Sequence, residues 1–433
     1  MKNVLKAIIF ATVLMLVGEA FAQGLPTAQP ETVDVSPERL SLIRAVLKKE
    51  VDADRMPGAV VMIARRGQLI YSEAMGFQDK EAGKPMTKDA IFRIYSMTKP
   101  LASVGAMMLV EEGKIQLNDP VSKFLPELAK MEVLVIDKDG KASREPAKRQ
   151  ITIHDLFRHT AGLTYGEFST IPEIKAAYAE AKILTQPSRL ITPEQFTAGI
   201  AKVPLVREPG TAFEYSLAVD VLGRVVEAVS GQRLSVFLNE RLFQPLKMPD
   251  TGFKVPEANW SRIAEPLPKN PLTGEPTEQM LDVKIDPTND LGGAGGVSTA
   301  ADYLRFCQMM LNGGVLDGRR YLSPTTVKLM TSDHLGNRPA SPLTPGALLM
   351  GVEGYTFGLG FMVRQGPGLA GVPGSEGEYM WAGYGGTFFW IDPKEQLAAV
   401  YMAQTPGATA TRQYYRRMIK ALVAQATGPV VAP

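Results

Sequence analysis

The sequence predicts an α+β fold, in which one antiparallel sheet flanked by helices is interrupted by an inserted, mostly helical lobe. Two pairs of apolar runs, one pair near each end of the 433 residues, are typical of strand hairpins. A segment with helical periodicity lies outside each hairpin, and the long middle part follows mostly helical patterns. We therefore expect the two termini to build one sheet of an α/β sandwich and the middle to form the lobe.

The first 22 residues predict a signal peptide. Lys2 and Lys6 precede an apolar run, and residues 20–22 form an A-x-A cleavage site. The run is too short to span a bilayer in the usual way. We therefore expect cleavage near Ala22, no stable membrane insertion, and a mature protein that is periplasmic or secreted.

The first predicted helix follows a leader at residues 23–35. Ser36 suits the N-cap of a helix and Pro37 suits its first position. We place the main domain at residues 36–425, which leaves a tail at 426–433. The apolar face of this helix consists of Leu40, Ile43 and Leu47.

Two hairpins supply the predicted sheet. Residues 58–76 contain two apolar runs around Arg66-Gly67, and residues 387–402 repeat the pattern around a turn at 392–394. A last helix follows the second hairpin, and its apolar side consists of Tyr415, Met418, Ile419 and Leu422.

The middle of the chain, about residues 97–290, predicts the inserted helical lobe. Within it, the polar stretch at 138–149 is typical of a solvent-exposed hairpin or loop. After the lobe, Thr299 and Asp302 have the spacing of a capping box, and they precede an amphipathic helix that contains Cys307.

Composition and charge exclude several classes of function. The chain is 45% apolar and 21% charged, which is typical of a globular protein with a large core. Its formal charge of +2 gives no electrostatic reason to bind nucleic acid. Cys307 is the only cysteine, so no intramolecular disulfide can form. His154, His159 and His334 are scattered without a metal-ligand spacing, and no nucleotide-binding fingerprint is present. We therefore expect neither a metal nor another cofactor.

The candidate nucleophile lies in residues 92–102, FRIYSMTKPLA. Pro100 is tolerated in the first turn of a helix but not in its interior, so the predicted helix over 97–112 must begin close to Ser96. The free N–H groups at such a helix start suit an oxyanion. Three positions further on, Lys99 lies on the same helix face, within reach of the Ser96 hydroxyl.

Lys99 needs a second group if it is to act as a base. The free pKa of a lysine, near ~10.4, makes a poor base at neutral pH. Burial lowers the pKa of an amine, and a nearby phenol would give the pair two ways to accept one proton. The S-x-x-K spacing is weak by itself and does not locate this phenol.

Four ordered segments carry a resemblance to a known family. They are FRIYSMTKPLASVGAMMLVEEGKIQLNDPVSKFLPEL, ITIHDLFRHTAGLTYG, PGTAFEYSLAVDVLGRVVEAVSG and GGAGGVSTAADYLRFCQMMLNGG. They resemble the class C β-lactamase-like serine hydrolases, among which family VIII carboxylesterases and related transesterases are the nearest look-alikes. The resemblance runs from about residue 36 to 425 and implies the β-lactamase/transpeptidase-like fold.

The resemblance implies a catalytic group of Ser96, Lys99 and Tyr215. In the family, the serine and lysine of S-x-x-K meet a tyrosine from a Y-x-N or Y-x-x motif, and YSL places Tyr215 there. This phenol would act with Lys99 as the general base and then as the acid to the leaving group. His159 is implied to be structural, and no G-x-S-x-G motif supports a Ser-His-Asp triad.

A third family motif is implied on a strand near the C-terminus. Trp381, Ala382 and Gly383 take the place of the family's K-T-G or W-G-G, and we expect all three to contact substrate. The next residue would lend a backbone N–H, so Tyr384 would share the oxyanion hole with the amide of Ser96. Removal of one such donor typically costs about 3 to 4 kcal/mol of transition-state stabilisation.

Two departures from the family pattern indicate the substrate. Leu217 stands where β-lactamases and penicillin-binding proteins have an asparagine, and we expect it to bind substrate. Trp381 stands where those enzymes use a lysine to hold the substrate carboxylate. A site without those groups loses charge-assisted contacts worth about 1.5 to 3 kcal/mol each. The departures favour an uncharged acyl or alcohol portion. They therefore favour a serine hydrolase that cleaves carboxylic esters, or transfers acyl groups, through an acyl-serine intermediate.

Two alternatives remain open at this point. One is a β-lactamase or D-amino acid peptidase of the same fold, and weak β-lactam opening would also fit an esterase because the acylation chemistry is shared. The other is a catalytically silent binding protein, which the presence of all three catalytic residues disfavours. We expect a small-molecule ester or amide as the substrate, and Phe168 or Tyr178 to help shape its pocket. The oligomeric state is left open.

Overall fold

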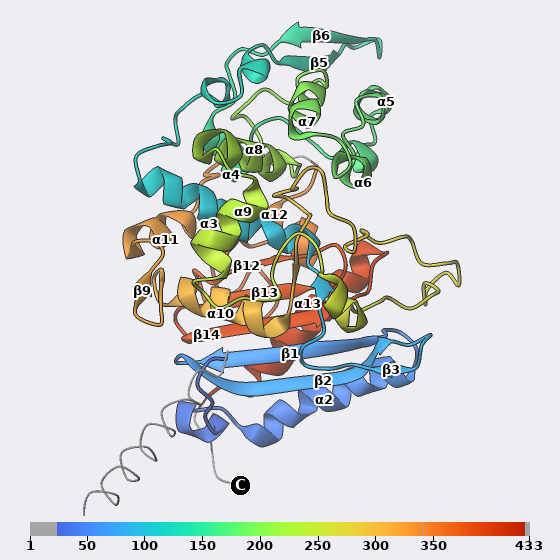
Figure 1. The fold of residues 1–433 in the computed structure, drawn as a ribbon, viewed down its shortest axis with the longest axis vertical. Coiled ribbons are helices and arrows are strands. Elements are labelled where there is room, and N and C mark those ends of the chain that lie inside the picture. The colour runs from blue at the N-terminus through green and yellow to red at the C-terminus, as the bar shows by residue number, and fades with distance from the viewer. Residues whose placement is uncertain (1–23, 341, 429–433) are drawn as a thin grey trace, which may run out of the picture.

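The computed structural model describes residues 24–340 and 342–428, and its centre is an eight-stranded antiparallel sheet (Figure 1). The first strand of the chain, β1, pairs with the second, β2, on one side and with the last, β14, on the other. The predicted sheet built by both termini is therefore confirmed. In spatial order the strands are β10 (Tyr355–Phe357), β11 (Met362–Arg364), β12 (Tyr379–Ala382), β13 (Phe388–Asp392), β14 (Leu397–Ala403), β1 (Gly58–Arg65), β2 (Gln68–Asp79) and β3 (Lys84–Pro85).

Local turn chemistry closes both predicted hairpins. Between β1 and β2, Arg66 and Gly67 have φ values of 51° and 78°, and a two-residue turn of type I′ requires positive φ at both positions. Between β13 and β14, the carboxylate of Asp392 accepts hydrogen bonds from the backbone N–H groups of Lys394 (3.1 Å) and Glu395 (3.2 Å). Each turn forms where the sequence predicted it.

Helices cover both faces of the sheet. They are α2 (Pro37–Asp52), α10 (Ala300–Leu311) and α13 (Thr409–Ala424). Successive residues of a strand point to opposite faces. In β13, the ring of Phe389 contacts Tyr303 of α10, whereas the next ring, Trp390, lies against Lys420 of α13. Helix α2 packs beside α13 and against β1 and β2, so the N- and C-terminal helices share one face.

Side-chain caps fix the starts of two of these helices. Ser36 Oγ accepts a hydrogen bond from the N–H of Arg39, as expected for an N-cap. Thr299 caps α10 by accepting from the N–H of Asp302, but the carboxylate of Asp302 turns to the N–H of Asp250 (2.8 Å). Only one half of the predicted capping box therefore forms. The predicted inner face of α2 is buried at Leu40, Ile43 and Leu47.

The lobe lies between two short strands that pair with each other, β4 (Phe92–Arg93) and β7 (Val297–Ser298). Figure 1 shows it above the sheet. Helix α3 (Thr98–Glu111) is buried along nearly its whole length, and α8 (Ala218–Ser230) packs against it. The lobe's further elements are β5 (Glu132–Ile136), β6 (Ala142–Pro146), α4 (Ile153–Phe157), α5 (Pro172–Glu180), α6 (Thr185–Ser188), α7 (Pro193–Ile200) and α9 (Leu234–Leu238).

The polar stretch predicted at 138–149 forms the turn and second strand of the β5–β6 hairpin. Between α10 and the edge strand β10 lie β8 (Val315–Leu316), β9 (Arg319–Arg320), α11 (Pro324–Met330) and α12 (Pro345–Met350). No helix of the described part of the chain is both long enough and apolar enough to cross a membrane. The signal peptide lies outside the described residues, and the division into leader, domain, lobe and tail stays a prediction.

Candidate active site

Ser96 lies on a tight turn between strand β4 and the buried helix α3. The turn is a short 3₁₀ helix, η2 (Tyr95–Met97), and Pro100 lies in the first turn of α3, as predicted. Tyr95 has a φ of 42°, which bulky residues rarely adopt, and its hydroxyl accepts a hydrogen bond from the N–H of Leu281 (3.0 Å). Backbone strain of this kind gathers at functional sites, and here it directly precedes the candidate nucleophile.

The three side chains predicted to be catalytic converge at this turn. The hydroxyl of Tyr215 donates a hydrogen bond to Ser96 Oγ at 2.8 Å, and Lys99 Nζ donates to the same oxygen at 3.3 Å. The ammonium group of Lys99 also lies 4.8 Å from the centre of the Tyr215 ring. Lys99 is fully buried, whereas Ser96 is partly exposed, so the nucleophile faces the opening with the amine behind it.

A second tyrosine, which no motif of the sequence indicated, belongs to the same cluster. Lys99 Nζ donates to the hydroxyl of Tyr165 at 2.8 Å and to the carbonyl of Gly293 at 2.7 Å. The ring of Tyr165 lies 5.6 Å from that of Tyr215, and burial raises the pKa of Tyr165 well above its usual value, which keeps it a neutral phenol. Ser96, Lys99, Tyr165 and Tyr215 thus form one cluster, in which each side chain contacts at least two others. The only signal for Tyr165 in the sequence was its place in the segment ITIHDLFRHTAGLTYG.

The glycine at position 293 connects the catalytic amine to a buried carboxyl group. The N–H of Gly293 donates to Oδ1 of Asp220 at 2.8 Å, while its carbonyl accepts from Lys99. A Cβ atom on Gly293 would lie 2.2 Å from Oδ2 of Asp220, so a larger residue would push the two apart. Burial raises the pKa of Asp220 to about 6, against the opposing effect of the Lys99 charge. Gly293, the second glycine of GGAGG, therefore helps to hold Lys99 in place.

His159 supports the phenol and not the nucleophile. Its ring lies 4.8 Å from that of Tyr215, and its Nδ1 shares a hydrogen bond with Ser216 Oγ (3.1 Å). Burial, and then the charge of Lys99, lowers the pKa of His159 well below its usual value, so the ring is neutral. The structural role that the resemblance implied agrees with these contacts.

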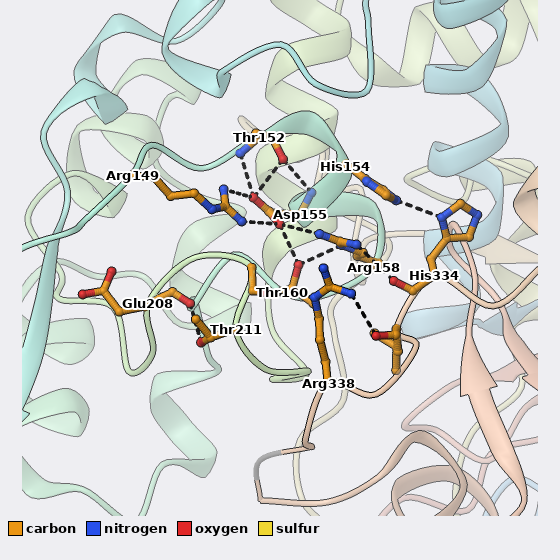
Figure 2. Close-up of polar contacts among 12 residues, drawn as sticks. Arg149, Thr152, His154, Asp155, Arg158, Thr160, Glu208, Thr211, His334 and Arg338 are labelled. Atoms are coloured by element: carbon orange, nitrogen blue, oxygen red, sulfur yellow. Dashed lines mark hydrogen bonds and ion pairs between the residues drawn. The ribbon is translucent and has the colours of Figure 1, made fainter.

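A buried carboxylate anchors the loop that carries His159 and Tyr165. Figure 2 shows Asp155, in α4, at the centre of this network. Burial alone would raise the pKa of Asp155, but hydrogen bonds hold it well below the ordinary value. The loop that leads to the catalytic phenols is thus fixed at its start. The donors to the Asp155 carboxylate are Arg149, Thr152, Arg158 and Thr160.

Ser96 opens into a cavity of about 440 Å³. Two of its walls are apolar side chains from α12 and from the loop around Phe168, and Phe168 itself is 63% exposed at the rim. Tyr178 is fully buried outside this lining, so only Phe168 of the two predicted pocket residues reaches the cavity. The predicted site residues among the lining are Ser96, Tyr215, Trp381, Ala382, Gly383 and Tyr384.

Trp381 and Leu217 lie in different surroundings. Trp381, on β12, forms part of the cavity wall, with its ring 5.4 Å from that of Tyr215 and 5.2 Å from that of Phe357. Leu217 is buried at the start of α8, where it lines a small separate cavity together with Tyr165. The structure therefore brings Trp381 to the catalytic group, but it does not place Leu217 in the large cavity.

Two arginines of α13 also line the cavity, and both bind neutral groups. Arg416 donates to the carbonyls of Leu349 (2.8 Å) and Gly383 (3.1 Å). Arg412 lies 4.4 Å from the ring centre of Tyr384 and donates to Thr409 Oγ1 (3.2 Å). Arg416 thus faces backbone carbonyls, whereas Arg412 faces a hydroxyl and an aromatic ring and also lies within electrostatic reach of Glu278.

This geometry fits acyl transfer to a serine. A nucleophile, two groups within reach of its proton, and backbone donors at a helix start are the parts such a reaction needs. Among residues 24–340 and 342–428, no group of three or more His, Cys, Asp or Glu side chains is placed to hold a metal ion.

Comparison with known proteins agrees with this geometry. A family model described as Beta-lactamase matches residues 43–424. An uncharacterized protein of Mycobacterium tuberculosis (strain CDC 1551 / Oshkosh) is 37% identical over 83% of this chain and 89% of its own length. Esterase EstB of Burkholderia gladioli is 30% identical over 86% of this chain and 94% of its own.

A solved structure extends the similarity to the whole fold. It is described as EstCE1, a hydrolase with promiscuous acyltransferase activity. Its TM-score with this chain is 0.73 at 29% sequence identity, and the match covers 89% of this chain and 99% of that one.

Proposed function

Since the chain belongs to the Beta-lactamase family, we propose that it hydrolyses carboxylic esters whose acyl group is uncharged, with Ser96 as the nucleophile. The family match, the esterase relative and the structural neighbour make the chain a serine hydrolase that cleaves esters or transfers acyl groups. The resemblance to esterases within this family is thereby confirmed. The observation that carries the finer proposal is the wall beside Ser96, where the indole of Trp381 packs on Tyr215 in the place where β-lactamases use a lysine. The two arginines of α13 in the same cavity donate to groups of the protein itself.

The acylation step uses the contacts around Ser96. Ser96 Oγ attacks the ester carbonyl carbon, and its proton passes to Lys99 and Tyr215, both of which hydrogen-bond to this oxygen. The developing oxyanion is stabilised by the backbone N–H groups of Ser96 and Tyr384. When the carbon–oxygen bond to the alcohol breaks, the phenol of Tyr215 returns the proton to the departing oxygen.

The second step releases the acyl group. A water molecule gives up a proton to the same pair and attacks the acyl-serine carbonyl carbon. The bond from this carbon to Ser96 Oγ then breaks, the pair returns the proton to Oγ, and the carboxylic acid is released. An alcohol in place of water would give a new ester, because the two nucleophiles need the same base. The cavity of about 440 Å³ leaves room for such an acceptor beside the acyl group.

A substrate panel tests this proposal. The purified chain and Ser96→Ala are assayed with short-chain p-nitrophenyl esters, a chromogenic cephalosporin and a D-amino acid peptide. We expect kcat/KM to be highest for the esters and to fall by roughly 10³-fold or more in Ser96→Ala. Cephalosporin turnover far above that of the esters would make the chain a β-lactamase. No turnover of any substrate, together with no labelling by a phosphonate, would make it a binding protein.

We also propose export, with the mature protein in the periplasm or secreted. The basic start, the apolar run and the A-x-A site at residues 20–22 support it. Expression of the full chain in a bacterium, followed by fractionation and mass spectrometry of the mature N-terminus, is expected to give Gln23 as the first residue. Recovery of the uncleaved chain in the cytoplasm would contradict this proposal.

A further inference from the structure

The peptide bond between Gly383 and Tyr384 is pressed against the segment that leads to Ser96. A Cβ atom on Gly383 would lie 2.4 Å from the carbonyl oxygen of Ile94 and 2.3 Å from Thr387 Oγ1. Only glycine fits this contact without a shift of the backbone. Because Ile94 precedes Ser96 by two residues, the packing holds the strand end and the nucleophile's turn at a fixed distance.

Arg416 fixes the orientation of this peptide bond. The carbonyl of Gly383 accepts from Arg416 Nη2 at 3.1 Å, and also from the N–H of Gly386 at 3.2 Å within a turn. In a trans peptide the carbonyl and the following N–H point in opposite directions. With the carbonyl held toward α13, the N–H of Tyr384 is turned the other way, and Tyr384 lines the cavity together with Ser96. Among the described residues this N–H has no hydrogen-bond acceptor.

We propose that Arg416 is a positioning residue for the oxyanion hole. Its guanidinium holds the Gly383–Tyr384 peptide with the N–H of Tyr384 free to receive the oxyanion. A charged donor on the carbonyl also polarises the amide, which makes its N–H a stronger donor. The inference rests on the proposed acyl transfer at Ser96 and adds a residue that no motif of the family resemblance contained.

The surroundings of Arg416 favour this role over simple packing. The side chain is 4% exposed, and no carboxylate of residues 24–340 and 342–428 forms an ion pair with it. Burial and the neighbouring charge of Arg412 lower its pKa to about 9, so it stays charged at neutral pH. A buried cation without a carboxylate partner is costly to keep, and two backbone carbonyls are its acceptors.

The adjacent residue provides a matched control. Arg417 donates to the carbonyl of Met350, just as Arg416 donates to that of Leu349, so both side chains tie α13 to α12. Arg417 does not line the cavity. Arg417→Met therefore removes the same kind of helix-to-helix contact without touching the Gly383 carbonyl.

The test compares Arg416→Met with Arg417→Met on a p-nitrophenyl ester and on its thiono analogue, whose sulfur accepts hydrogen bonds more weakly. We expect kcat of Arg416→Met on the ester to fall by about 10- to 100-fold, because loss of a whole oxyanion donor costs roughly 10²- to 10³-fold. KM should change less than about threefold, since the contact matters in the transition state. The preference for ester over thionoester should fall by a similar factor, while Arg417→Met keeps the wild-type preference.

An unchanged ester-to-thionoester preference in Arg416→Met would overturn the inference, even if its stability fell. Ser96→Ala separates this failure from failure of the proposed function, since full activity in Ser96→Ala would remove the nucleophile itself. If Arg416→Met does not fold, Arg416→Gln replaces it. Its amide is two bonds shorter and cannot reach both carbonyls, so the same loss of preference is expected, and a wild-type preference there would equally contradict the positioning role.

Discussion

At Ser96 the structure places an amine and a phenol on one oxygen atom. Tyr215 donates to Ser96 Oγ at 2.8 Å and Lys99 at 3.3 Å, so either group can take the proton once it is deprotonated. Tyr165 lies behind both, with its hydroxyl 2.8 Å from Lys99 Nζ. The proton of the nucleophile is thus handled by a cluster and not by a single base.

Tyr215→Phe is expected to remove most of the activity and to leave the fold intact. The ring keeps its packing against Trp381 and His159, while the hydroxyl that contacts Ser96 is lost. Loss of a general acid–base group costs roughly 10²- to 10⁴-fold. Steady-state kinetics on a p-nitrophenyl ester, with circular dichroism as the check on folding, measure this change. Near-normal rates would remove the role assigned to Tyr215.

Tyr165→Phe is expected to lower kcat by about 10-fold and to shift the pH–rate profile, because Lys99 loses one of its three hydrogen-bond acceptors. Tyr178→Phe is the matched control. Tyr178 is buried close by, and its hydroxyl accepts from the N–H of Thr164 without reaching Lys99. Identical pH–rate profiles for the two variants would show that Tyr165 only fills space.

The sequence predicted the catalytic residues only in part. Ser96 and Lys99 are three positions apart and so lie on one helical turn. Local geometry was therefore enough to predict that the two side chains meet. Tyr215 lies 119 residues further along the chain, and only the family resemblance placed it there. Tyr165 and Asp220 reach Lys99 through tertiary contacts that carry no local pattern. Leu217 was placed by motif position, but it is buried and lines a small separate cavity together with Tyr165.

At the level of elements, α4 is tied to α11 by a pair of histidines. His334 Nε2 bonds to the carbonyl of Leu329, so its Nδ1 accepts the hydrogen bond from His154 Nε2 at 2.8 Å. Figure 2 shows the two rings beside the Asp155 network. Burial, followed by the charge of Arg158, lowers the pKa of His154 to about 4.

This shift predicts a loss of stability in mild acid. The unfolded chain, with a histidine pKa near ~6.5, binds a proton more readily than the folded one, so the free energy of unfolding falls as pH falls from about 6.5 to 4. Above about pH 6.5, the contribution of the neutral His154 to the free energy of unfolding is fully present. We expect His154→Gln, which can still donate to His334, to show a smaller drop in melting temperature between pH 7 and pH 4.5. Equal pH dependence in the two proteins would refute this prediction.

Element prediction succeeded where local chemistry decides the conformation. The N-cap at Ser36, the turn at Arg66-Gly67 and the buried start of α3 follow from residue preferences and from the place of Pro100. The two-residue strands β4 and β7 carry no periodicity that a sequence could show. The carboxylate of Asp302 accepts from the N–H of Asp250 and the hydroxyl of Thr251, two partners far away in sequence that no local pattern could indicate.

For the whole molecule, the sheet was predictable and the cavity was not. Hairpins and helices at both ends of the chain indicated one sheet, and β1 does pair with β14. The cavity gathers side chains from η2, the loop before α5, the segment between α7 and α8, α12, β12 and α13, and no pattern in the sequence shows that these segments meet. Arg416 is the clearest example, because its partner Gly383 lies on another element 33 residues earlier.

Peptide mass spectrometry after inactivation by a p-nitrophenyl phosphonate shows directly whether Ser96 is the nucleophile. Trypsin does not cut before Pro100, so residues 94–114 form one peptide that contains both Ser96 and Ser103. We expect one phosphonyl group on this peptide, located at Ser96 by fragmentation, and no adduct in Ser96→Ala. An adduct on another residue, or equal labelling of Ser96→Ala, would contradict it.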